Sequence, residues 1–277
     1  MKYQFADLII RSFLFVLTRF SRASRQRFIN AITPLILKLA SKTKRRAFDN
    51  ITKAMPHLTV QQADDLVLAS YKVIAYGVLE CFWLDELEVD IKCDENTLRL
   101  LNNPAGVSVA TMHMSCYELA PLAINKIVGS VTTLSKLPKF MPSAAAIYQK
   151  ANISVIDKNE SNSLFKLLGA ARQGAAVCLH ADHYSKEVDV TFFGRSTKAP
   201  SGSALISAYS KVPLLLCYPV LNDDGKYTVY FETIVDSYVD NNPVAISQAI
   251  NTIYQRFEVI ILKHPTQWYW SYNRWRQ

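Results

Sequence analysis

From about Gly106 onward, short β-rich runs alternate with helical segments, and this alternation limits the possible folds more than any other feature of the sequence. The β-rich runs cover residues 107–111, 128–134, 153–156, 175–179, 188–193, 213–220 and 227–235. The helical candidates cover residues 117–127, 143–151, 161–173, 201–210 and 243–262. Strand–helix alternation of this kind predicts one α/β domain, in which helices cover a sheet.

The composition excludes several other classes of protein. Half of the 277 residues are hydrophobic, the chain has eight Gly and eleven Pro, and the mean hydropathy is +0.06. These values exclude a disordered regulator, a coiled coil, a disulfide scaffold and a multi-span transporter. The five cysteines form no CxxC pair and their number is odd. We therefore expect reduced thiols that pack as small core residues.

The positive charge is concentrated in the N-terminal fifth of the chain. Residues 1–56 contain twelve Lys or Arg and two Asp, a net charge of +10, whereas the whole chain carries +8. The other 221 residues are therefore slightly acidic, with a net charge of −2. An excess of this kind in one region predicts a separate partner for that region.

The same region is rich in aliphatic and aromatic residues. Residues 8–20 and 31–40 are largely apolar, but Arg11 and Lys38 interrupt them before they reach the ~20 residues of a spanning helix. We expect two short helices over residues 1–40 that lie in a membrane interface. The candidates for membrane contact are Arg11, Phe13, Phe15, Arg19 and Arg22. The alternatives are a basic arm packed on the protein and a nucleic-acid patch, and the interleaved aliphatic residues disfavour nucleic acid.

Two regions follow from these patterns. Residues 1–56 form the basic, membrane-associating region, and residues 57–277 form the α/β domain. The second region is predicted to open with a long helix over residues 59–84, in which Thr59 and Gln62 form a capping box.

Residues 107–120, VSVATMHMSCYELA, contain the most informative motif. A predicted strand ends at His113 and a helix begins near Tyr117, so His113 lies where open α/β sheets bind ligands. Glu118 follows with H-x4-E spacing, and its carboxylate can accept the Nδ1–H of the imidazole and raise the basicity of Nε2. Such a pair can deprotonate an alcohol for attack on an acyl group. Ser115 and Glu118 also match a capping box, which would explain Glu118 without catalysis.

Three further clusters have two interpretations each. His180, Asp182 and His183 follow another predicted strand, and with His113 and Glu118 they could bind the metal of a hydrolase, although their spacing is not that of a zinc site. Arg195 could hold an anion near a predicted helix start at residues 201–202, or the segment could be an ordinary strand and turn. The aromatic run at residues 267–276 suits a membrane interface or packing on the core.

Taken in order, these motifs resemble the bacterial lipid A biosynthesis (late) acyltransferases, within the lysophospholipid acyltransferase superfamily. The resemblance covers nearly the whole chain. It includes residues 45–50 with 54–56, the H-x4-E motif, Phe-Phe-Gly at 192–194, Pro-Ser-Gly at 200–202, and the ending at 265–270 with Arg274 and Trp275. It implies the glycerol-phosphate-acyltransferase-like fold, a mixed and mostly parallel sheet covered by helices.

The resemblance also implies an activity. The expected reaction transfers a fatty acyl chain from a thioester of acyl carrier protein or CoA to a hydroxyl of an anionic glycolipid, such as a lipid A precursor. His113 would act as the general base and Glu118 would orient it, with no metal, no cofactor and no acyl-enzyme. The expected location is the cytoplasmic face of the bacterial inner membrane, and nucleic acid is not expected as a partner.

The chain departs from the family pattern at three places. Lys136 and Lys158 stand where the family commonly has Arg, and Asp182-His183 replaces its usual Asp-Gln. Lys136, Lys158, Asp182 and Arg195 are the candidates for oxyanion or substrate binding. A Lys can hold one oxygen but lacks the planar fork of Arg. Transfer to another lipid acceptor, and a catalytically inactive lipid-binding relative, therefore remain alternatives.

Overall fold

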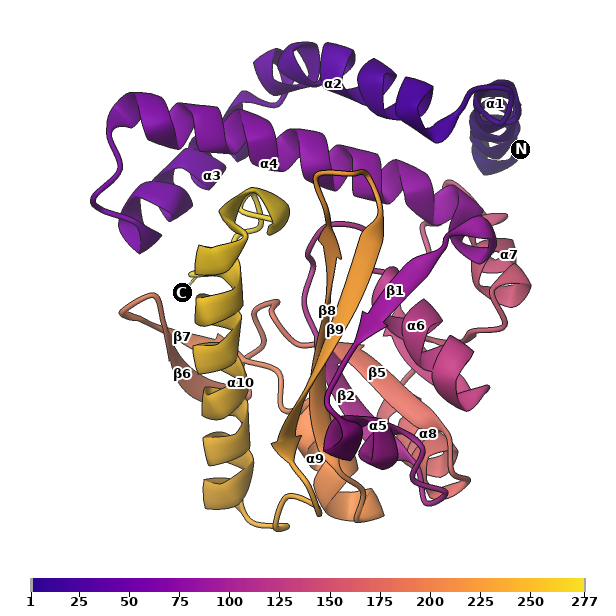
Figure 1. The fold of residues 1–277 in the computed structure, drawn as a ribbon, viewed down its shortest axis with the longest axis vertical. Helices are drawn as coiled ribbons and strands as arrows, with labels where there is room; N and C mark the ends of the chain where they lie inside the picture. Colours follow the sequence, from indigo (N-terminus) through magenta and orange to yellow (C-terminus); the bar gives the residue numbers. More distant parts are fainter. Residues whose placement is uncertain (1, 277) are drawn as a thin grey trace.

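Seven strands form the central sheet of residues 2–276, the part of the chain that the computed structural model describes (Figure 1). In spatial order they are β1 (Val89–Lys92), β9 (Tyr227–Val235), β8 (Leu214–Leu221), β2 (Val107–Thr111), β5 (Ala176–His180), β3 (Val131–Ser135) and β4 (Ser154–Asp157). The five strands from β8 to β4 are parallel, and β9 and β1 run the opposite way. The predicted mixed, mostly parallel sheet is confirmed.

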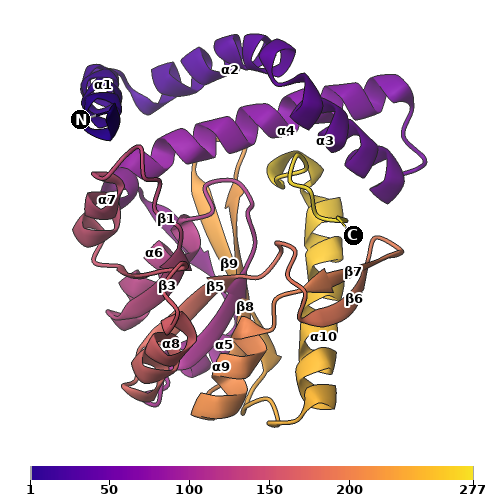
Figure 2. The same cartoon turned by 180° about the vertical axis from the view of Figure 1, so that it is seen from behind.

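Helices cover both faces of this sheet (Figures 1 and 2). On one face lie α5 (Glu95–Leu101) and α6 (Leu119–Val128), and on the other lie α8 (Ser163–Arg172), α9 (Gly202–Ser210) and α10 (Pro243–Lys263). The short helix α7 (Ala144–Lys150) contacts the edge strand β4. This arrangement buries both faces of the central strands β2, β5 and β8, which explains why their sequences are largely apolar.

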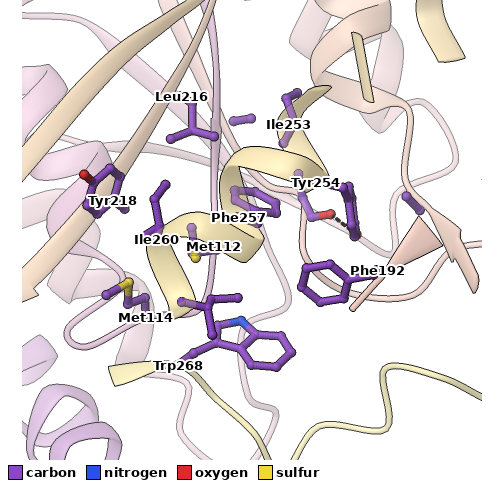
Figure 3. Packing of buried hydrophobic residues seen from close by; sticks show 14 of the residues in the cluster. Met112, Met114, Phe192, Leu216, Tyr218, Ile253, Tyr254, Phe257, Ile260 and Trp268 are labelled. Atoms are coloured by element: carbon purple, nitrogen blue, oxygen red, sulfur yellow. Dashed lines mark hydrogen bonds between the residues drawn. The ribbon is translucent and has the colours of Figure 1, made fainter. Parts of the chain in front are cut away.

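Because successive side chains of a strand point to opposite faces of the sheet, the core is divided into two layers. In β2, Val107 and Val109 pack in the layer that contains α6, whereas Ala110 packs in the layer that contains α10. Leu215 and Leu216 of β8 divide in the same way. Figure 3 shows the α10 layer, in which Trp268 of the C-terminal run packs near Met114 and Phe192.

Several elements are absent from the sequence-based prediction. They are β1, α5, α3 (Ser41–Ala54) and β7 (Arg195–Ala199), which pairs with β6 (Val188–Phe192) in a separate antiparallel hairpin. β1 has only four residues and β7 reads RSTKA, so neither has a strong apolar alternation. The other predicted strands and helices are present, with ends that differ by up to four residues.

Four N-terminal helices lie over one end of the sheet (Figures 1 and 2). They are α1 (Lys2–Leu17), α2 (Arg22–Leu39), α3 and α4 (Val60–Glu80), and a 3-10 segment at Cys81–Glu86 extends α4. The predicted capping box is confirmed, because Thr59 Oγ1 accepts from the Gln62 amide and Gln62 Oε1 accepts from the Thr59 amide. Residues 60–86 are long and apolar enough to cross a membrane, but 39% of the most apolar stretch is buried inside the protein.

The helices α1 and α2 present a large apolar surface to solvent. Phe13 is 48% exposed and Phe15 is 62% exposed, and Arg11 and Arg19 are exposed beside them. Other exposed apolar side chains on the two helices are Phe5, Leu8, Ile9, Val16, Phe28, Leu35 and Leu39. These helices are the two predicted over residues 1–40, and their exposed surface suits an apolar environment better than water.

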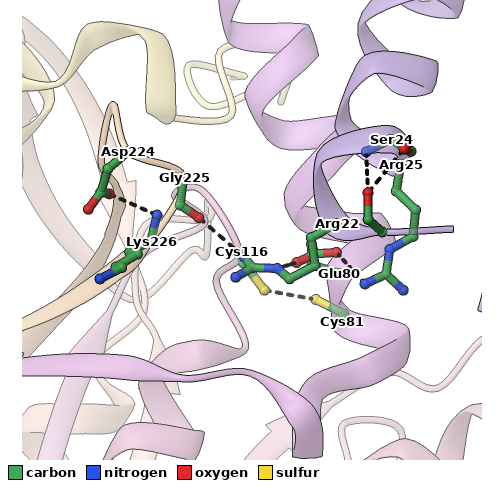
Figure 4. A network of polar contacts seen from close by, with 10 residues as sticks. Arg22, Ser24, Arg25, Glu80, Cys81, Cys116, Asp224, Gly225 and Lys226 are labelled. Atoms are coloured by element: carbon green, nitrogen blue, oxygen red, sulfur yellow. Dashed lines mark hydrogen bonds and ion pairs between the residues drawn. The ribbon is translucent and has the colours of Figure 1, made fainter.

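Arg22 differs from the other candidates for membrane contact, because its side chain binds a buried carboxylate. Its Nε donates to Glu80 Oε2 at 2.7 Å, and Arg25 lies 3.6 Å from the other oxygen of the same carboxylate (Figure 4). Glu80 is fully buried, and Arg25 stacks over the Trp83 ring at 4.0 Å. A buried carboxylate needs such partners, so Arg22 attaches α2 to α4, while its side chain remains 37% exposed.

Candidate active site

Four neighbouring parallel strands bring the predicted site residues to one edge of the sheet. His113 follows β2, Asp182 and His183 follow β5, Lys136 follows β3 and Lys158 follows β4. The register pairs Thr111 of β2 with His180 of β5, so the loops after these two strands begin side by side. Ligands of open α/β sheets bind outside the carboxyl ends of their strands, and the site lies there.

The closest contact in this group joins His113 and Asp182. His113 Nδ1 lies 2.7 Å from Asp182 Oδ1, and the backbone amide of His113 donates to Asp182 Oδ2 at 3.0 Å. The indole Nε1 of Trp268 also donates to Oδ2, at 2.9 Å. Because an ionised carboxylate only accepts, Nδ1 carries the proton and the lone pair of the neutral ring is on Nε2.

The electrostatics of Asp182 agree with this geometry. Its side chain is almost completely buried, and burial alone would raise its pKa. The charge of His113 and the hydrogen bonds from His113 and Trp268 outweigh burial and hold the pKa of Asp182 well below its usual range. Asp182 is therefore a carboxylate at neutral pH, with its charge directed at the His113 ring.

Glu118 does not occupy the position that the H-x4-E spacing predicts. The prediction that its carboxylate accepts from His113 Nδ1 is wrong in this structure, because Asp182 holds that nitrogen and Glu118 Oε1 accepts from Tyr148 of α7 at 2.8 Å. The capping-box alternative is also wrong. Ser115 has a left-handed backbone, with φ 51°, and its amide donates to Gln267 O, so Glu118 does not cap it.

Glu118 nevertheless lies within electrostatic reach of His113. Burial raises the pKa of Glu118, and the Tyr148 hydrogen bond and the charge of His113 only partly oppose that rise. The structure thus brings two buried carboxylates to one histidine and gives them opposite pKa shifts. Such divergence is typical of sites where two acids have different roles.

Aromatic rings enclose the His113 imidazole. The His183 ring stacks on it, with centroids 3.8 Å apart and an interplanar angle of 4°, and the Tyr272 ring stacks on the far side of His183 at 3.7 Å. His180 and Tyr117 lie at 4.5 and 5.0 Å from the His113 centroid. Burial, with the charge of His113, lowers the pKa of His183 to about 3, so His183 is neutral at pH 7.

The three other predicted site residues have different surroundings. Lys158 is exposed, yet its charge is close enough to contribute to the lowered pKa of His183. Lys136 is also exposed, and within residues 2–276 its side chain forms no hydrogen bond or ion pair. Arg195 lies over the Trp275 ring at 4.3 Å, in the β6–β7 hairpin. Arg195 thus packs on Trp275 while its Nη1 has no hydrogen-bond partner within residues 2–276, and its role in oxyanion or substrate binding stays a prediction.

The C-terminal run holds the His113 loop in place. Met114 and Trp268 form an antiparallel bridge, the Tyr269 amide donates to His113 O at 3.1 Å, and the Ser115 amide donates to Gln267 O at 2.7 Å. Trp268 and Trp270 are each 1% exposed, so packing on the core is the correct alternative for these two residues. The role of Trp268 was not predicted, because its partner Asp182 lies 86 residues away in the chain.

The cluster of His113, Asp182 and His183 also has the residue types of a metal site, with ligand atoms within 4.8 Å of one another. Its geometry disfavours that function. Imidazole ligands bind a metal in the plane of the ring, and the planes of His113 and His183 are nearly parallel and separated by the stacking distance. The lone pairs of the two rings therefore do not converge on one point, and Asp182 Oδ1 is already bonded to His113.

The arrangement is suited to proton transfer. Nε2 of His113 forms no hydrogen bond within the described residues, and its ring orientation is fixed by Asp182. A base held in this way can take a proton from a hydroxyl that lies within hydrogen-bond reach.

Comparison with known proteins adds two findings. A model of the family described as bacterial lipid A biosynthesis acyltransferase matches residues 2–277. The crystal structure of the 1-acyl-sn-glycerophosphate (LPA) acyltransferase, PlsC, from Thermotoga maritima matches with 13% identity and a TM-score of 0.44, over 93% of this chain and 100% of that chain. The comparison with curated proteins gives no match.

Proposed function

The chain belongs to the bacterial lipid A biosynthesis acyltransferase family, and we propose on that basis that it transfers a fatty acyl chain from an acyl thioester to a hydroxyl of a glycolipid. The thioester is carried by acyl carrier protein or CoA, and the acceptor is a lipid A precursor. The observation that carries the proposal is the 2.7 Å contact between His113 Nδ1 and Asp182 Oδ1, which leaves Nε2 as the free base.

The reaction requires no covalent enzyme intermediate. Nε2 of His113 takes the proton of the acceptor hydroxyl while the hydroxyl oxygen attacks the thioester carbonyl carbon. The tetrahedral intermediate then collapses, the C–S bond breaks, and the leaving sulfur receives the proton from His113. Asp182 fixes the tautomer and stabilises the imidazolium that forms between these two steps.

Glu118 and the lysines have supporting roles in this proposal. Glu118 lies within electrostatic reach of the imidazolium but does not touch Nδ1, because its carboxylate accepts from Tyr148; burial raises its pKa, so it contributes less negative charge than Asp182. Lys158 is the better placed of the two lysines to meet the negative charge of the carbonyl oxygen, since its charge already acts on His183. Lys136 is at the adjacent strand end and is the second candidate.

The exposed surface of the N-terminal helices is suited to binding a membrane. Their exposed Phe and aliphatic side chains lie beside Arg11 and Arg19, a combination that suits the interface of a bilayer with anionic headgroups. We assign this surface to the cytoplasmic face of the inner membrane, where a soluble acyl donor and a lipid acceptor can both reach His113.

The test is an assay of lipid products. Purified protein in detergent receives acyl carrier protein thioesters or acyl-CoA, together with a bacterial lipid extract, and products are identified by mass spectrometry. We expect thiol release and an acyl-sized mass gain on one phosphorylated glycolipid, with both lost in His113→Ala. A mass gain on another lipid would identify a different acceptor. Folded wild-type protein that releases no thiol from either donor would contradict the proposal and favour a lipid-binding relative.

A further inference from the structure

Helix α4 touches the backbone of the His113 loop at Gly77. A Cβ atom added at Gly77 would lie 2.4 Å from Ser115 O, 2.6 Å from Ser115 C and 2.7 Å from the Cys116 amide nitrogen. All three atoms belong to one peptide unit, so no side chain can rotate to relieve the overlap. Any substitution at Gly77 must move either the helix or the loop that carries His113.

The loop is held in a conformation that needs support. Ser115 has φ 51°, in the left-handed region that residues other than Gly rarely adopt. It is fully buried, and its amide is bound by Gln267 O on the side of the C-terminal run. The peptide that follows Ser115 meets α4. The loop is therefore enclosed between two elements that come from opposite ends of the chain.

A second contact between α4 and the loop lies one helical turn after Gly77. The Sγ atoms of Cys81 and Cys116 are 3.6 Å apart (Figure 4). Cys81 Sγ also lies 3.3 Å from Gly77 O. Arg22 and Arg25 bind the neighbouring Glu80. The end of α4 that meets the loop is thus fixed on its other side by α2.

On the basis of the proposed acyl transfer, we propose that Gly77 is a positioning residue for His113: its missing side chain lets α4 press directly on the Ser115–Cys116 peptide and so fixes the imidazole against Asp182. A Cβ at this position moves the loop, because the opposing atoms are backbone. Misplacement of a catalytic base by about 1 Å can cost as much as 100-fold in rate.

The test compares Gly77→Ala with Gly169→Ala. Both glycines lie in helices, and a Cβ at Gly169 meets nothing within 4 Å, so the control gains the same helix propensity without the overlap. We expect Gly77→Ala to remain folded and to lose about 10- to 100-fold in kcat, with KM for the acyl donor nearly unchanged. Gly169→Ala should keep the wild-type kcat.

A second readout does not depend on activity. The proton between His113 Nδ1 and Asp182 should give a far-downfield NMR resonance, identified by its loss in His113→Ala and in Asp182→Asn. We expect this resonance to be lost or shifted in Gly77→Ala and unchanged in Gly169→Ala. If the wild type transfers no acyl chain, the proposed function fails, while this resonance still tests the positioning role.

Two results would overturn the inference. One is a folded Gly77→Ala protein with wild-type kcat and an unchanged resonance. If Gly77→Ala does not fold, Cys81→Met applies the displacement at the second contact. The longer Met side chain meets the Cys116 side chain, which is fully buried and has no free space to turn into, whereas position 81 is only partly buried. We expect a clear fall in kcat and a shifted resonance in Cys81→Met, and wild-type values for both would also overturn the inference.

Discussion

At the scale of single residues, the site depends on how differently its two carboxylates are solvated. Asp182 accepts three N–H groups and keeps its charge, whereas Glu118 accepts one hydroxyl and has a raised pKa. A buried carboxylate with several donors remains ionised, and one with few donors favours its neutral form. This contrast is the physical reason for assigning Asp182, and not Glu118, as the partner of His113.

The sequence alone could not reveal that Asp182, and not Glu118, bonds to His113 Nδ1. The H-x4-E spacing predicted that Glu118 would accept from His113, but Ser115 has a left-handed backbone and the Glu118 carboxylate accepts from Tyr148 instead. Asp182 reaches His113 only because β5 inserts between β2 and β3, which are consecutive in the chain apart from one helix. Neither the turn nor the strand order has a clear signal in the residue pattern.

His183 gives a prediction for the pH dependence of stability. Its pKa is about 3 in the folded protein against 6.5 for an unperturbed histidine, so between these values only the unfolded chain takes up this proton. The stability that neutral His183 supports is complete above pH 6.5 and is lost as the pH falls below it. When the pH falls from 7 to 5, the free energy of unfolding should decrease in the wild type by about 1–2 kcal/mol more than it does in His183→Gln.

Urea titrations of both proteins at the two pH values measure this difference. Equal losses in the wild type and in His183→Gln would show that folding does not lower the pKa of His183, contrary to its stacked and partly buried position.

At the scale of elements, the ion-pair group of Glu80 joins α2 to α4. Glu80 is fully buried and faces two arginines, so removal of both leaves an unpaired buried charge. We predict that Arg22→Ala with Arg25→Ala lowers the free energy of unfolding by about 3–5 kcal/mol. Adding Glu80→Gln should recover part of the loss, because it removes the unpaired charge.

The exposed pair of Lys44 and Asp64 provides the control. Its side chains are 45% and 43% exposed, and Lys44→Ala should change the unfolding free energy by about 1 kcal/mol or less. Chemical denaturation measures all of these variants. A loss in the double arginine variant no larger than in Lys44→Ala would show that Glu80 does not hold α2 in place.

The elements that the sequence predicted are those with a strong apolar period. The buried strands β2, β5 and β8 and the long helices α4 and α10 meet this condition, because burial on one or two faces determines their residue types. β1, α5 and β7 are short or polar, and their conformation depends on neighbours that are distant in the chain. The orientation of the Arg22 side chain was likewise not predictable from the local sequence, since its partner Glu80 is distant in the chain.

At the scale of the whole molecule, the apolar surface of α1 and α2 lies at the end of the protein opposite to α8 (Figures 1 and 2). We predict that Phe13→Asp with Phe15→Asp weakens binding to vesicles that contain anionic lipid by about 100-fold or more, because each buried Phe side chain contributes roughly 1.5–3 kcal/mol. Phe165 of α8 is 76% exposed, and Phe165→Asp serves as the control. Vesicle co-sedimentation at low salt provides the measurement, and equal binding by both variants would remove the lipid assignment from α1 and α2.

Helix α3 and the C-terminal run meet beside the candidate active site. Asn50 of α3 donates to Trp270 O and Tyr272 O, and Tyr272 stacks on His183, which stacks on His113. Helix α3 of the N-terminal region therefore supports the segment whose Tyr272 ring stacks on His183, while α1 and α2 present an apolar surface. The boundary predicted at residue 56 separates a basic segment from a slightly acidic one. The hydrogen bonds of Asn50 to the C-terminal run cross this boundary.

The most direct test of the account compares single-turnover acyl transfer in Asp182→Asn and Glu118→Gln, with thiol release as the signal. We predict a loss of about 10²–10⁴-fold in Asp182→Asn, because His113 loses its orienting carboxylate, and a loss of less than about tenfold in Glu118→Gln. Both proteins should melt cooperatively. A larger loss in Glu118→Gln than in Asp182→Asn would contradict the account and make Glu118 the working partner of His113.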